Sequence, residues 1–394
     1  MYYVLGDKLY MRIQKIFIIC FLTVFSTVTS AQVKIRLFSN QSPESAVFSV
    51  THGQYEVNCF NGEPLIVKTG EPVVIYRFNG KLAVKARSSK GFICDSVIFS
   101  GQTGDDNFSL MINIDNPVRQ YYSGDLQCFP DMGALVLINL CDIEKYISGV
   151  VITEGGIGRN IEYFKTQAVI ARTYMYKYFD KHQADRYDVC DNTHCQAFNG
   201  LSSDSIINMA VLETNGQVLL APDSTLIISA FHSNCGGETS SSEDVWLTSQ
   251  PYLKRVADPF CVSSRNAKWE KKISMDDWLE FVKRSGYIGT ADDPMVFSFV
   301  QKFRLTDYKI GSFTIPLRAI RTELNLRSTF FSVVLEGDSI KLVGRGYGHG
   351  VGLCQEGAMV MADKGFNYKQ IIDFYYTGVV ISDIKNVVIL PPDN

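Results

Sequence analysis

The stretch that decides the fold is Tyr146-Ile-Ser-Gly-Val-Val-Ile-Thr-Glu154, with Lys165-Thr-Gln-Ala-Val-Ile-Ala-Arg-Thr-Tyr174 shortly after it. An apolar run at 135–140 precedes this stretch and predicts a buried strand. Apolar residues spaced by three and four predict a helix over about 161–179, and Gly155 and Gly156 favour a loop around Glu154. A buried strand followed by a packed helix is typical of an α+β domain.

The segments on either side of this stretch differ in the secondary structure that their residue patterns predict. Residues 32–117 contain short β-branched and aromatic runs separated by turns such as Asn79-Gly80, which predict an all-β module. Toward the C-terminus the patterns predict both strands and helices. The predicted helices are 205–214, 275–284, 357–363 and 368–376, and the predicted strands are 330–335 and 340–343. The sequence therefore predicts an α+β protein with a β-rich N-terminal module at 32–117 and a larger domain at 118–385.

Composition excludes some classes of function. A chain of 394 residues suits about two domains. The 46% of hydrophobic residues and 20% of charged residues are ordinary for a protein with a full core. The net charge of -3 and the lack of a Lys/Arg stripe argue against a nucleic-acid partner.

The N-terminus has the pattern of a secretory signal peptide. A basic start at 11–15 precedes an apolar run at 16–28, and Thr29-Ser30-Ala31 supplies small residues for cleavage. The run is short for a membrane span. Cys20 follows Ile19 rather than a small residue, which disfavours a lipoprotein anchor. We therefore predict a signal peptide at 1–31, a periplasmic or extracellular location, and no membrane span after signal removal.

Four segments concentrate polar residues and glycine. In the first, Glu154 follows an apolar stretch, where partial desolvation would raise its pKa toward a proton-donating role. In the second, Cys190 and Cys195 stand five apart near His182 and His194. Thiolate and imidazole suit zinc, yet two cysteines in an exported protein can also form a short-loop disulfide. The choice between zinc, disulfide and free thiols stays open at this point.

The other two segments offer groups that suit a polar ligand. The third is Ala230-Phe-His-Ser-Asn-Cys-Gly-Gly-Glu-Thr239, followed by Trp246, whose flat face suits a sugar ring. The fourth is Gly344-Arg-Gly-Tyr-Gly-His-Gly-Val-Gly-Leu-Cys-Gln-Glu-Gly-Ala358. It lacks the βαβ context of a nucleotide loop, and its histidine and glutamine suit a neutral polar ligand. Taken alone, the third segment favours an ordinary polar turn with a buried Trp, and the fourth is equally compatible with a binding site and a structural loop.

Taken in order, the four segments resemble the stage II sporulation protein D family (SpoIID/LytB). The resemblance rests on Tyr146-Ile-Ser-Gly-Val-Val-x-x-Glu154 and Lys165-x-Gln-Ala-Val-x-Ala-Arg-Thr-Tyr174, and on the two glycine-rich segments. The latter match as His232-Ser-x-x-Gly-Gly-x-Thr239 with Val245-Trp246, and as Gly348-His-Gly-Val-Gly-Leu-x-Gln355-x-Gly-Ala358. The Tyr375-Tyr-Thr-Gly378 ending is also similar. Coverage runs from about 121 to 381.

The resemblance implies a peptidoglycan lytic transglycosylase. Such an enzyme cuts the bond between N-acetylmuramic acid and N-acetylglucosamine without water and leaves a 1,6-anhydro end. Glu154 corresponds to the catalytic acid and base, and the resemblance implies zinc on His182, Cys190 and Cys195, with His194 as an alternative ligand. The substrate-binding residues expected from the matching motifs are Lys165, Arg172, Gln196, Ser233, Gly236, Trp246, His349 and Gln355.

The sequence departs from the family where Gly155-Gly156 follows Glu154 and where Cys235 and Cys354 replace common serines. The two replacements suggest a Cys235–Cys354 disulfide, with Cys235–Cys261 as an alternative. The expected partners are peptidoglycan glycan strands, either intact or already stripped of their stem peptides. A cell-wall amidase is a further possible partner. Two alternatives stand beside the enzyme: a non-catalytic peptidoglycan-binding stimulator of an amidase, and a structural wall protein that binds through its β-rich half.

Overall fold

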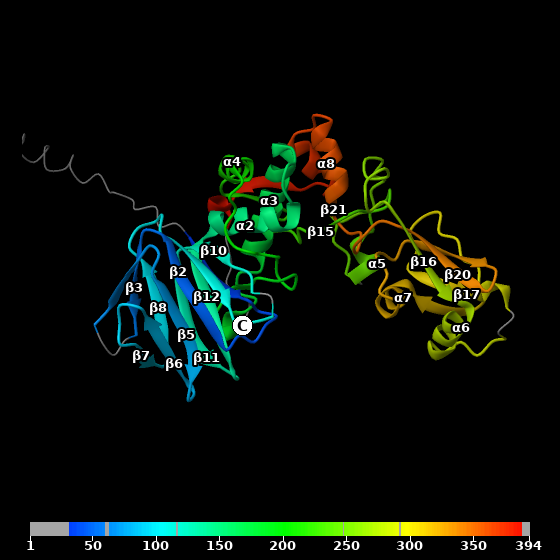
Figure 1. Cartoon of the computed structure of the whole chain (residues 1–394). Helices are drawn as coiled ribbons and strands as arrows, with labels where there is room; N and C mark the ends of the chain where they lie inside the picture. Colours follow the sequence, from blue (N-terminus) through cyan, green and yellow to red (C-terminus); the bar gives the residue numbers. More distant parts are fainter. Residues whose placement is uncertain (1–30, 60–62, 116, 247, 291–292, 388–394) are drawn as a thin grey trace, which may run out of the picture. The chain divides into compact units, whose positions relative to one another are not determined.

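The computed structural model describes residues 31–59, 63–115, 117–246, 248–290 and 293–387 (Figure 1). The predicted signal peptide at 1–31 lies outside the described residues except for Ala31. Within the described part of the chain, no helix combines the length and apolar character needed to cross a membrane.

Two β-sheets form the N-terminal region (Figure 1). A seven-stranded sheet has the order β13-β1-β12-β11-β8-β3-β4, and a six-stranded sheet has the order β10-β9-β2-β5-β6-β7. The strands are β1 (Gln32–Leu37), β2 (Ser45–His52), β3 (Gln54–Asn58), β4 (Leu65–Lys68), β5 (Pro72–Phe78), β6 (Lys81–Ala86), β7 (Phe92–Cys94), β8 (Val97–Gly101), β9 (Asn107–Ile112), β10 (Gln120–Ser123), β11 (Asp125–Asp131), β12 (Ala134–Asp142) and β13 (Val189–Cys190).

Aromatic side chains join the inner faces of the two sheets. Phe48 of β2 lies with its ring centroid 5.2 Å from that of Tyr55 on β3 and 4.3 Å from that of Phe99 on β8. All three rings are fully buried, and each such burial stabilises the fold by roughly 1.5–3 kcal/mol. Because side chains alternate between the two faces of a strand, every second side chain of these strands lies in the core that the two sheets share.

The β-rich region is larger than the predicted module at 32–117. Strands β10, β11 and β12 pair within the same two sheets, so the sheet region continues to Asp142. The apolar run expected to belong to the next domain is β12, the strand from which the chain enters the first helix. Strand β13 also returns to this region, because Ile35 and Val189 pair in parallel.

Helices α2 (Ile143–Gly155), α3 (Ile161–Lys177), α4 (Ser205–Glu213), α8 (Gln355–Asp363) and α9 (Tyr368–Tyr375) form the next region (Figure 1). Helix α3 packs against each of the other four and against β14 (Gln217–Leu220), which pairs with β22 (Val380–Asp383). Short strands β15 (Phe231–His232) and β21 (Leu353–Cys354) pair in parallel. The region joins β-strands and helices, and the predicted α+β class with a β-rich N-terminal part is confirmed.

A second hydrophobic core lies within residues 268–345 and was not predicted as a separate region. Strands β16 (Lys268–Ser274), β19 (Phe331–Glu336) and β20 (Ser339–Arg345) form a sheet, and β17 (Asp307–Ile310) pairs with β18 (Phe313–Pro316). Helix α6 (Met275–Arg284) buries Trp278 in this core, with its Nε1–H donated to the Val296 carbonyl oxygen at 2.7 Å. Helix α7 (Leu317–Glu323) contributes Leu317 and Ile320.

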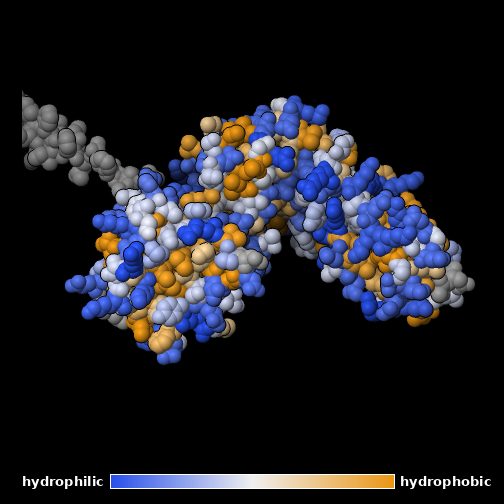
Figure 2. All heavy atoms as spheres, viewed as in Figure 1, coloured by the Kyte–Doolittle hydropathy of each residue, from blue (hydrophilic) through white to orange (hydrophobic). Residues whose placement is uncertain are grey.

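Hydrophobic residues also reach the surface of the β-rich region, as Figure 2 shows. Strand β5 exposes Val74, Tyr76 and Phe78 on alternate positions, while Val73 and Ile75 are buried. The strand is therefore apolar on both faces, and its outer face contributes to the hydrophobic surface of this region.

Candidate active site

Helix α2 carries Glu154 in its last turn, not in the loop that was predicted. The helix begins after Asp142, whose Oδ1 accepts hydrogen bonds from the N–H groups of Glu144 and Lys145. The glycines that suggested a loop end the helix, because Gly156 adopts a φ of 73° that glycine accommodates readily. Glu154 is therefore held on a regular element instead of a mobile loop.

Gly149 explains why the first motif contains a glycine in a helix. A side chain at this position would overlap the carbonyl oxygen of Gly200 and the ring of Phe198. The missing Cβ lets α2 approach the 196–200 segment closely. From that segment the Ala197 N–H donates to Glu154 Oε1 at 3.0 Å.

A buried ion pair fixes α2 to α3. Arg172 is fully buried, and its Nε and Nη2 donate to the two carboxylate oxygens of Glu144 at 2.8 and 2.5 Å. Arg172 was predicted to bind substrate, but the structure places it between helices and away from the cavity that Glu154 lines. Its contribution to the site is to position α2.

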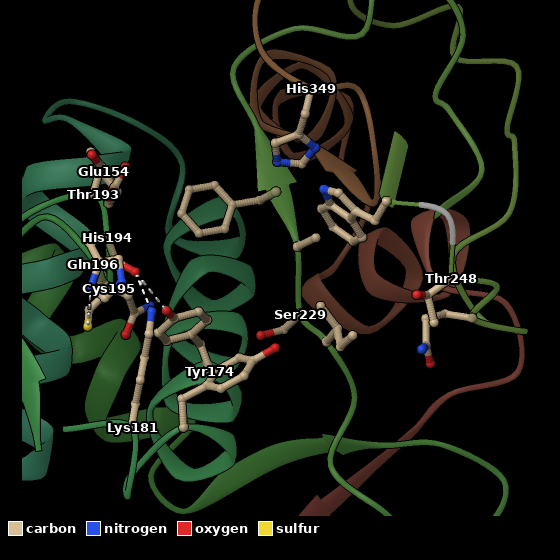
Figure 3. A pocket seen from close by; sticks show the side chains of 16 residues that line it. Glu154, Tyr174, Lys181, Thr193, His194, Cys195, Gln196, Ser229, Thr248 and His349 are labelled. Carbon is tan, nitrogen blue, oxygen red and sulfur yellow. Dashed lines mark hydrogen bonds between the residues drawn. The ribbon is translucent and has the colours of Figure 1, made fainter. Parts of the chain in front are cut away.

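Glu154 lines a cavity of about 690 Å³, as Figure 3 shows. This volume falls within the usual range for small-molecule sites. The cavity brings together four of the predicted catalytic and substrate-binding residues, namely Glu154, Gln196, Trp246 and His349. The other residues that line it are Tyr174, Tyr178, Lys181, Thr193, His194, Cys195, Ile228, Ser229, Ala230, Phe231, Thr248 and Gln250.

The surroundings of Glu154 favour its protonated form. Burial raises the pKa of its carboxyl, and the hydrogen bond from Ala197 N–H opposes this shift. The position in the last turn of α2 acts in the same direction as burial, because the C-terminal end of a helix is electronegative. Among the described residues that line the cavity, Glu154 is the only carboxylate.

Aromatic rings form much of the remaining wall. Tyr174 and Tyr178, one turn apart at the end of α3, lie with their ring centroids 4.6 Å apart. Trp246 lies 5.5 Å from His349 between ring centroids. Burial lowers the pKa of His349 to about 4, and its Nδ1 accepts the N–H of Val351, so the imidazole is neutral at neutral pH. Neutral donors and flat apolar rings suit an uncharged sugar.

The other four predicted substrate-binding residues make contacts within the protein and do not line the cavity. Gln355 donates its Nε2 to the backbone oxygen of Glu154 at 3.1 Å and so positions the end of α2. Ser233 accepts a hydrogen bond from Asn266, and Lys165 forms ion pairs with Glu162 and Glu213. Gly236 has a φ of 74° and packs against the backbone of Arg345. None of these four lines the cavity, because each is occupied by a contact within the protein.

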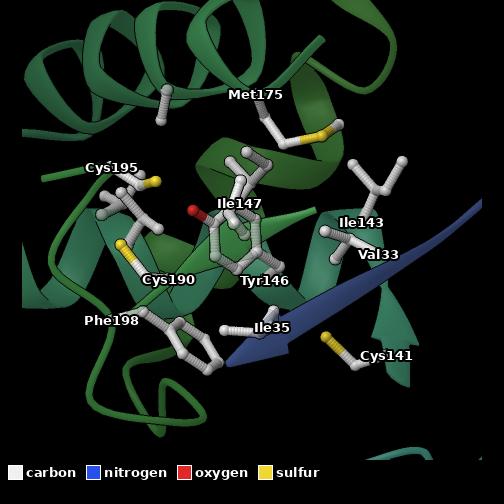
Figure 4. Packing of buried hydrophobic residues seen from close by; sticks show 14 of the residues in the cluster. Val33, Ile35, Cys141, Ile143, Tyr146, Ile147, Met175, Cys190, Cys195 and Phe198 are labelled. Carbon is white, nitrogen blue, oxygen red and sulfur yellow. The ribbon is translucent and has the colours of Figure 1, made fainter. Parts of the chain in front are cut away.

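The second segment forms a compact group of possible metal ligands. One ligand atom from each of His182, Cys190, His194 and Cys195 lies within 4.8 Å of the others. Contact with Cys195, together with His194, lowers the pKa of the Cys190 thiol to about 4. Two thiols and two imidazoles are a known zinc-binding set, so the residues present fit the ion. Both cysteines flank the buried ring of Tyr146 (Figure 4), whose hydroxyl donates to Gln196.

The predicted Cys235–Cys354 and Cys235–Cys261 disulfides are absent from the structure. All nine cysteines within the described residues are free. The sulfur atoms of Cys235 and Cys261 lie 3.3 Å apart, well beyond the length of an S–S bond. Cys354 also lies here, since the Cys235 N–H donates to its sulfur. Cys235 and Cys354 are therefore neighbours, although no bond joins them.

Sequence reasoning did not predict that Tyr174 and Tyr178 form a wall of the cavity, or that Ser229 lines it. Tyr174 ended a quoted motif, and a second tyrosine four positions later was a usable signal. Ser229 carried no such signal, because its hydroxyl meets α3 at the Ile170 carbonyl oxygen, 59 residues earlier in the sequence.

The comparison of this sequence with known proteins agrees with the predicted resemblance. The profile described as SpoIID, Stage II sporulation protein, matches residues 131–220, which include α2, Glu154 and α3. Together with the relatives below, this match confirms the resemblance to the stage II sporulation protein D family.

Three relatives show how much of the chain is similar to known proteins. Stage II sporulation protein D of Bacillus subtilis is 29% identical over 259 residues, covering 61% of this chain and 74% of the relative. The amidase enhancer of Bacillus subtilis is 28% identical, covering 60% of this chain and only 40% of that protein. An uncharacterized protein of Brachyspira hyodysenteriae is 28% identical over 377 residues, covering 93% of this chain and 96% of that protein. The similarity to the last protein thus includes the β-rich region.

Proposed function

We propose that this protein is a secreted lytic transglycosylase that cleaves peptidoglycan between N-acetylmuramic acid and N-acetylglucosamine. The observation that carries the proposal is the half-buried Glu154, with a raised pKa, in the wall of an aromatic-lined cavity. The similarity to stage II sporulation protein D supports a role at the cell wall. The products would be one strand ending in 1,6-anhydromuramic acid and one strand with a new free hydroxyl.

Glu154 would move one proton in each of two steps. The Ala197 hydrogen bond holds Oε1, which leaves Oε2 as the oxygen that carries the proton. In the first step this proton passes to the bridging glycosidic oxygen as the bond from that oxygen to the muramyl carbon breaks. In the second step the Glu154 carboxylate takes the proton of the muramyl 6-hydroxyl. The oxygen of that hydroxyl bonds to the same muramyl carbon and closes the 1,6-anhydro ring. No water is consumed, and Glu154 ends protonated.

The single carboxylate distinguishes this reaction from hydrolysis. Most glycoside hydrolases need two carboxyl groups that flank the scissile bond. Among the described cavity residues only Glu154 offers one, which suits an acid that later serves as the base. Tyr174, Tyr178 and Trp246 would stack on sugar rings, and neutral His349 would contact their hydroxyl or acetamido groups.

The test is digestion of purified sacculi, intact or first stripped of stem peptides by an amidase, with anhydro ends measured by mass spectrometry. Loss of a general acid typically costs about 10²–10⁴-fold, so Glu154→Gln should lose that much activity. Glu213→Gln is the control, because Glu213 pairs with Lys165 away from the cavity. Equal activity of Glu154→Gln and the wild type would end the assignment.

A second candidate function is stimulation of a cell-wall amidase without glycan cleavage. The relative named amidase enhancer supports it. In this case Glu154→Gln would still increase release of stem peptides by an added amidase, and no anhydro ends would form with either protein. The same digests, scored for both products, separate the two candidates.

We also propose that His182, Cys190, His194 and Cys195 hold one zinc ion. Its role would be structural, because it would fix the loop that carries Gln196 and the Ala197 N–H. Metal analysis of the purified protein should find one zinc ion per chain fewer in Cys190→Ser than in the wild type. A Cys190–Cys195 disulfide in a non-reduced digest would contradict this proposal.

A further inference from the structure

A second group of ligand atoms lies outside the cavity, where Cys235, Asp258, Cys261 and Cys354 converge. One atom from each lies within 4.8 Å of the others. All four residues are fully buried. They come from three segments distant in sequence: the chain after β15, the loop at 258–261, and the start of α8. No family motif accounts for the group, since two of the cysteines replace serines that are common in the family.

We propose that these four residues form a structural zinc site, distinct from the group at His182. Three thiolates and one carboxylate are ligands that zinc accepts, and soft sulfur favours zinc over magnesium or calcium. Four protein ligands fill a tetrahedral site, as in structural rather than catalytic zinc centres. The proposal does not depend on glycan cleavage.

The distances fit one ion. In a tetrahedron with zinc–sulfur bonds of about 2.3 Å, neighbouring sulfurs are roughly 3.8 Å apart. Here Cys235 Sγ lies 3.3 Å from Cys261 Sγ and 3.2 Å from Asp258 Oδ2. These separations need only a few tenths of an ångström of expansion to admit zinc.

The surroundings supply the hydrogen bonds that such a site requires. The Gly357 N–H at the start of α8 donates to Cys354 Sγ at 3.4 Å, and the Cys235 N–H donates to it at 3.3 Å. The Tyr375 hydroxyl donates to Asp258 Oδ2 at 2.9 Å, and the Phe260 N–H donates to Oδ1 at 2.8 Å. Outer hydrogen bonds of this kind orient metal ligands.

Charge is also partly balanced. Three thiolates, one carboxylate and a divalent ion carry a net charge of about −2 in a buried place. The guanidinium of Arg304 is buried beside them, and its Nη2 donates to the Cys235 carbonyl oxygen at 2.6 Å. The N-terminus of α8, with Cys354 as its cap, contributes a further positive potential.

A disulfide explains the same residues less well. Three cysteines cannot all pair with one another, so any bond leaves one thiol and the Asp258 carboxylate buried together. One ion satisfies all four groups. It would also tie Cys354 to the chain after β15 and so hold the adjacent Gln355 against Glu154.

The experiment measures zinc per chain in the purified full protein and in single variants. Cys261→Ser should lose one ion relative to wild type, whether or not the His182 group holds another. Cys141→Ser is the matched control, because Cys141 is buried, free and in neither group, and it should retain the wild-type content. Equal zinc in Cys261→Ser and the wild type would overturn the proposal.

Two further measurements cover a variant that fails to fold. In a cobalt-loaded protein that lacks Cys190 and Cys195, the sulfur-to-cobalt absorption band should grow by about one third on Asp258→Cys, as three thiolates become four. An unchanged band overturns the proposal. So does a Cys235–Cys261 or Cys235–Cys354 cross-link in a non-reduced digest of freshly purified protein.

Discussion

Removing the negative charge of Glu144 tests whether the ion pair with Arg172 holds α2 in place. In Glu144→Gln the fully buried guanidinium loses its counter-charge but keeps one neutral acceptor of the same size. Breaking a buried pair typically costs about 3–5 kcal/mol. The Glu144 side chain is 24% exposed, so water can partly compensate and we expect the low end, about 3 kcal/mol.

The assay is urea unfolding followed by far-ultraviolet circular dichroism. At a slope of about 3 kcal/mol/M, this loss lowers the midpoint by roughly 1 M. The control is Asp95→Asn, because Asp95 pairs with Lys81 at the surface, with side chains 76% and 52% exposed. Such exposed pairs contribute about 0–1 kcal/mol. If both variants shift the midpoint equally, burial does not set the strength of the Arg172 pair and the reasoning is wrong.

Three other predictions concern Glu154 and its supports. Burial raises the pKa of Glu154 in the folded state, so the folded protein binds this proton more tightly and its stability falls as pH rises from the ordinary glutamate pKa through the raised one. Glu154→Gln should therefore melt higher than wild type at neutral pH and equally at acid pH, and calorimetry showing a less stable variant at neutral pH would contradict this. Gly149→Ala should lower the free energy of unfolding by about 1–3 kcal/mol and reduce activity, because the added methyl group overlaps Phe198 and Gly200. Unchanged stability and activity would show that α2 does not need to approach the 196–200 segment so closely. Gln355→Leu should lower the rate of glycan cleavage with little change in melting temperature, since it removes one hydrogen bond to the end of α2, worth about 1 kcal/mol; a rate equal to wild type would remove its positioning role.

Local patterns predicted much of the helical structure. The helix expected at 161–179 is α3, and those expected at 205–214 and 275–284 are α4 and α6 within one residue. Their apolar spacing and side-chain caps such as Ser274 lie within the segments themselves. Glu154 was assigned to a loop because the two glycines after it resemble a turn, while the helix that contains it begins eleven residues earlier.

The site was less accessible to prediction because its parts meet over long distances in sequence. The order of motifs indicated that Glu154, Gln196, Trp246 and His349 belong to one function, and they line one cavity. Arg172 and Lys165 belong to the same motifs, yet each meets a carboxylate inside the protein. The spacing of residues in a motif cannot distinguish a side chain that positions the site from one that lines it, because the motif contains both.

The parallel pairing of β1 with β13 constrains the order in which the protein folds. Lys34 N–H donates to Asp188 across 154 residues of sequence, and Phe38 and Ser39 donate to Asp191 beside Cys190. A chain that emerges N-terminus first therefore presents its first strand long before that partner arrives. Closing so long a loop is slow. The loop proposed to bind zinc therefore acquires its neighbouring strand only after the chain between β1 and β13 has been made.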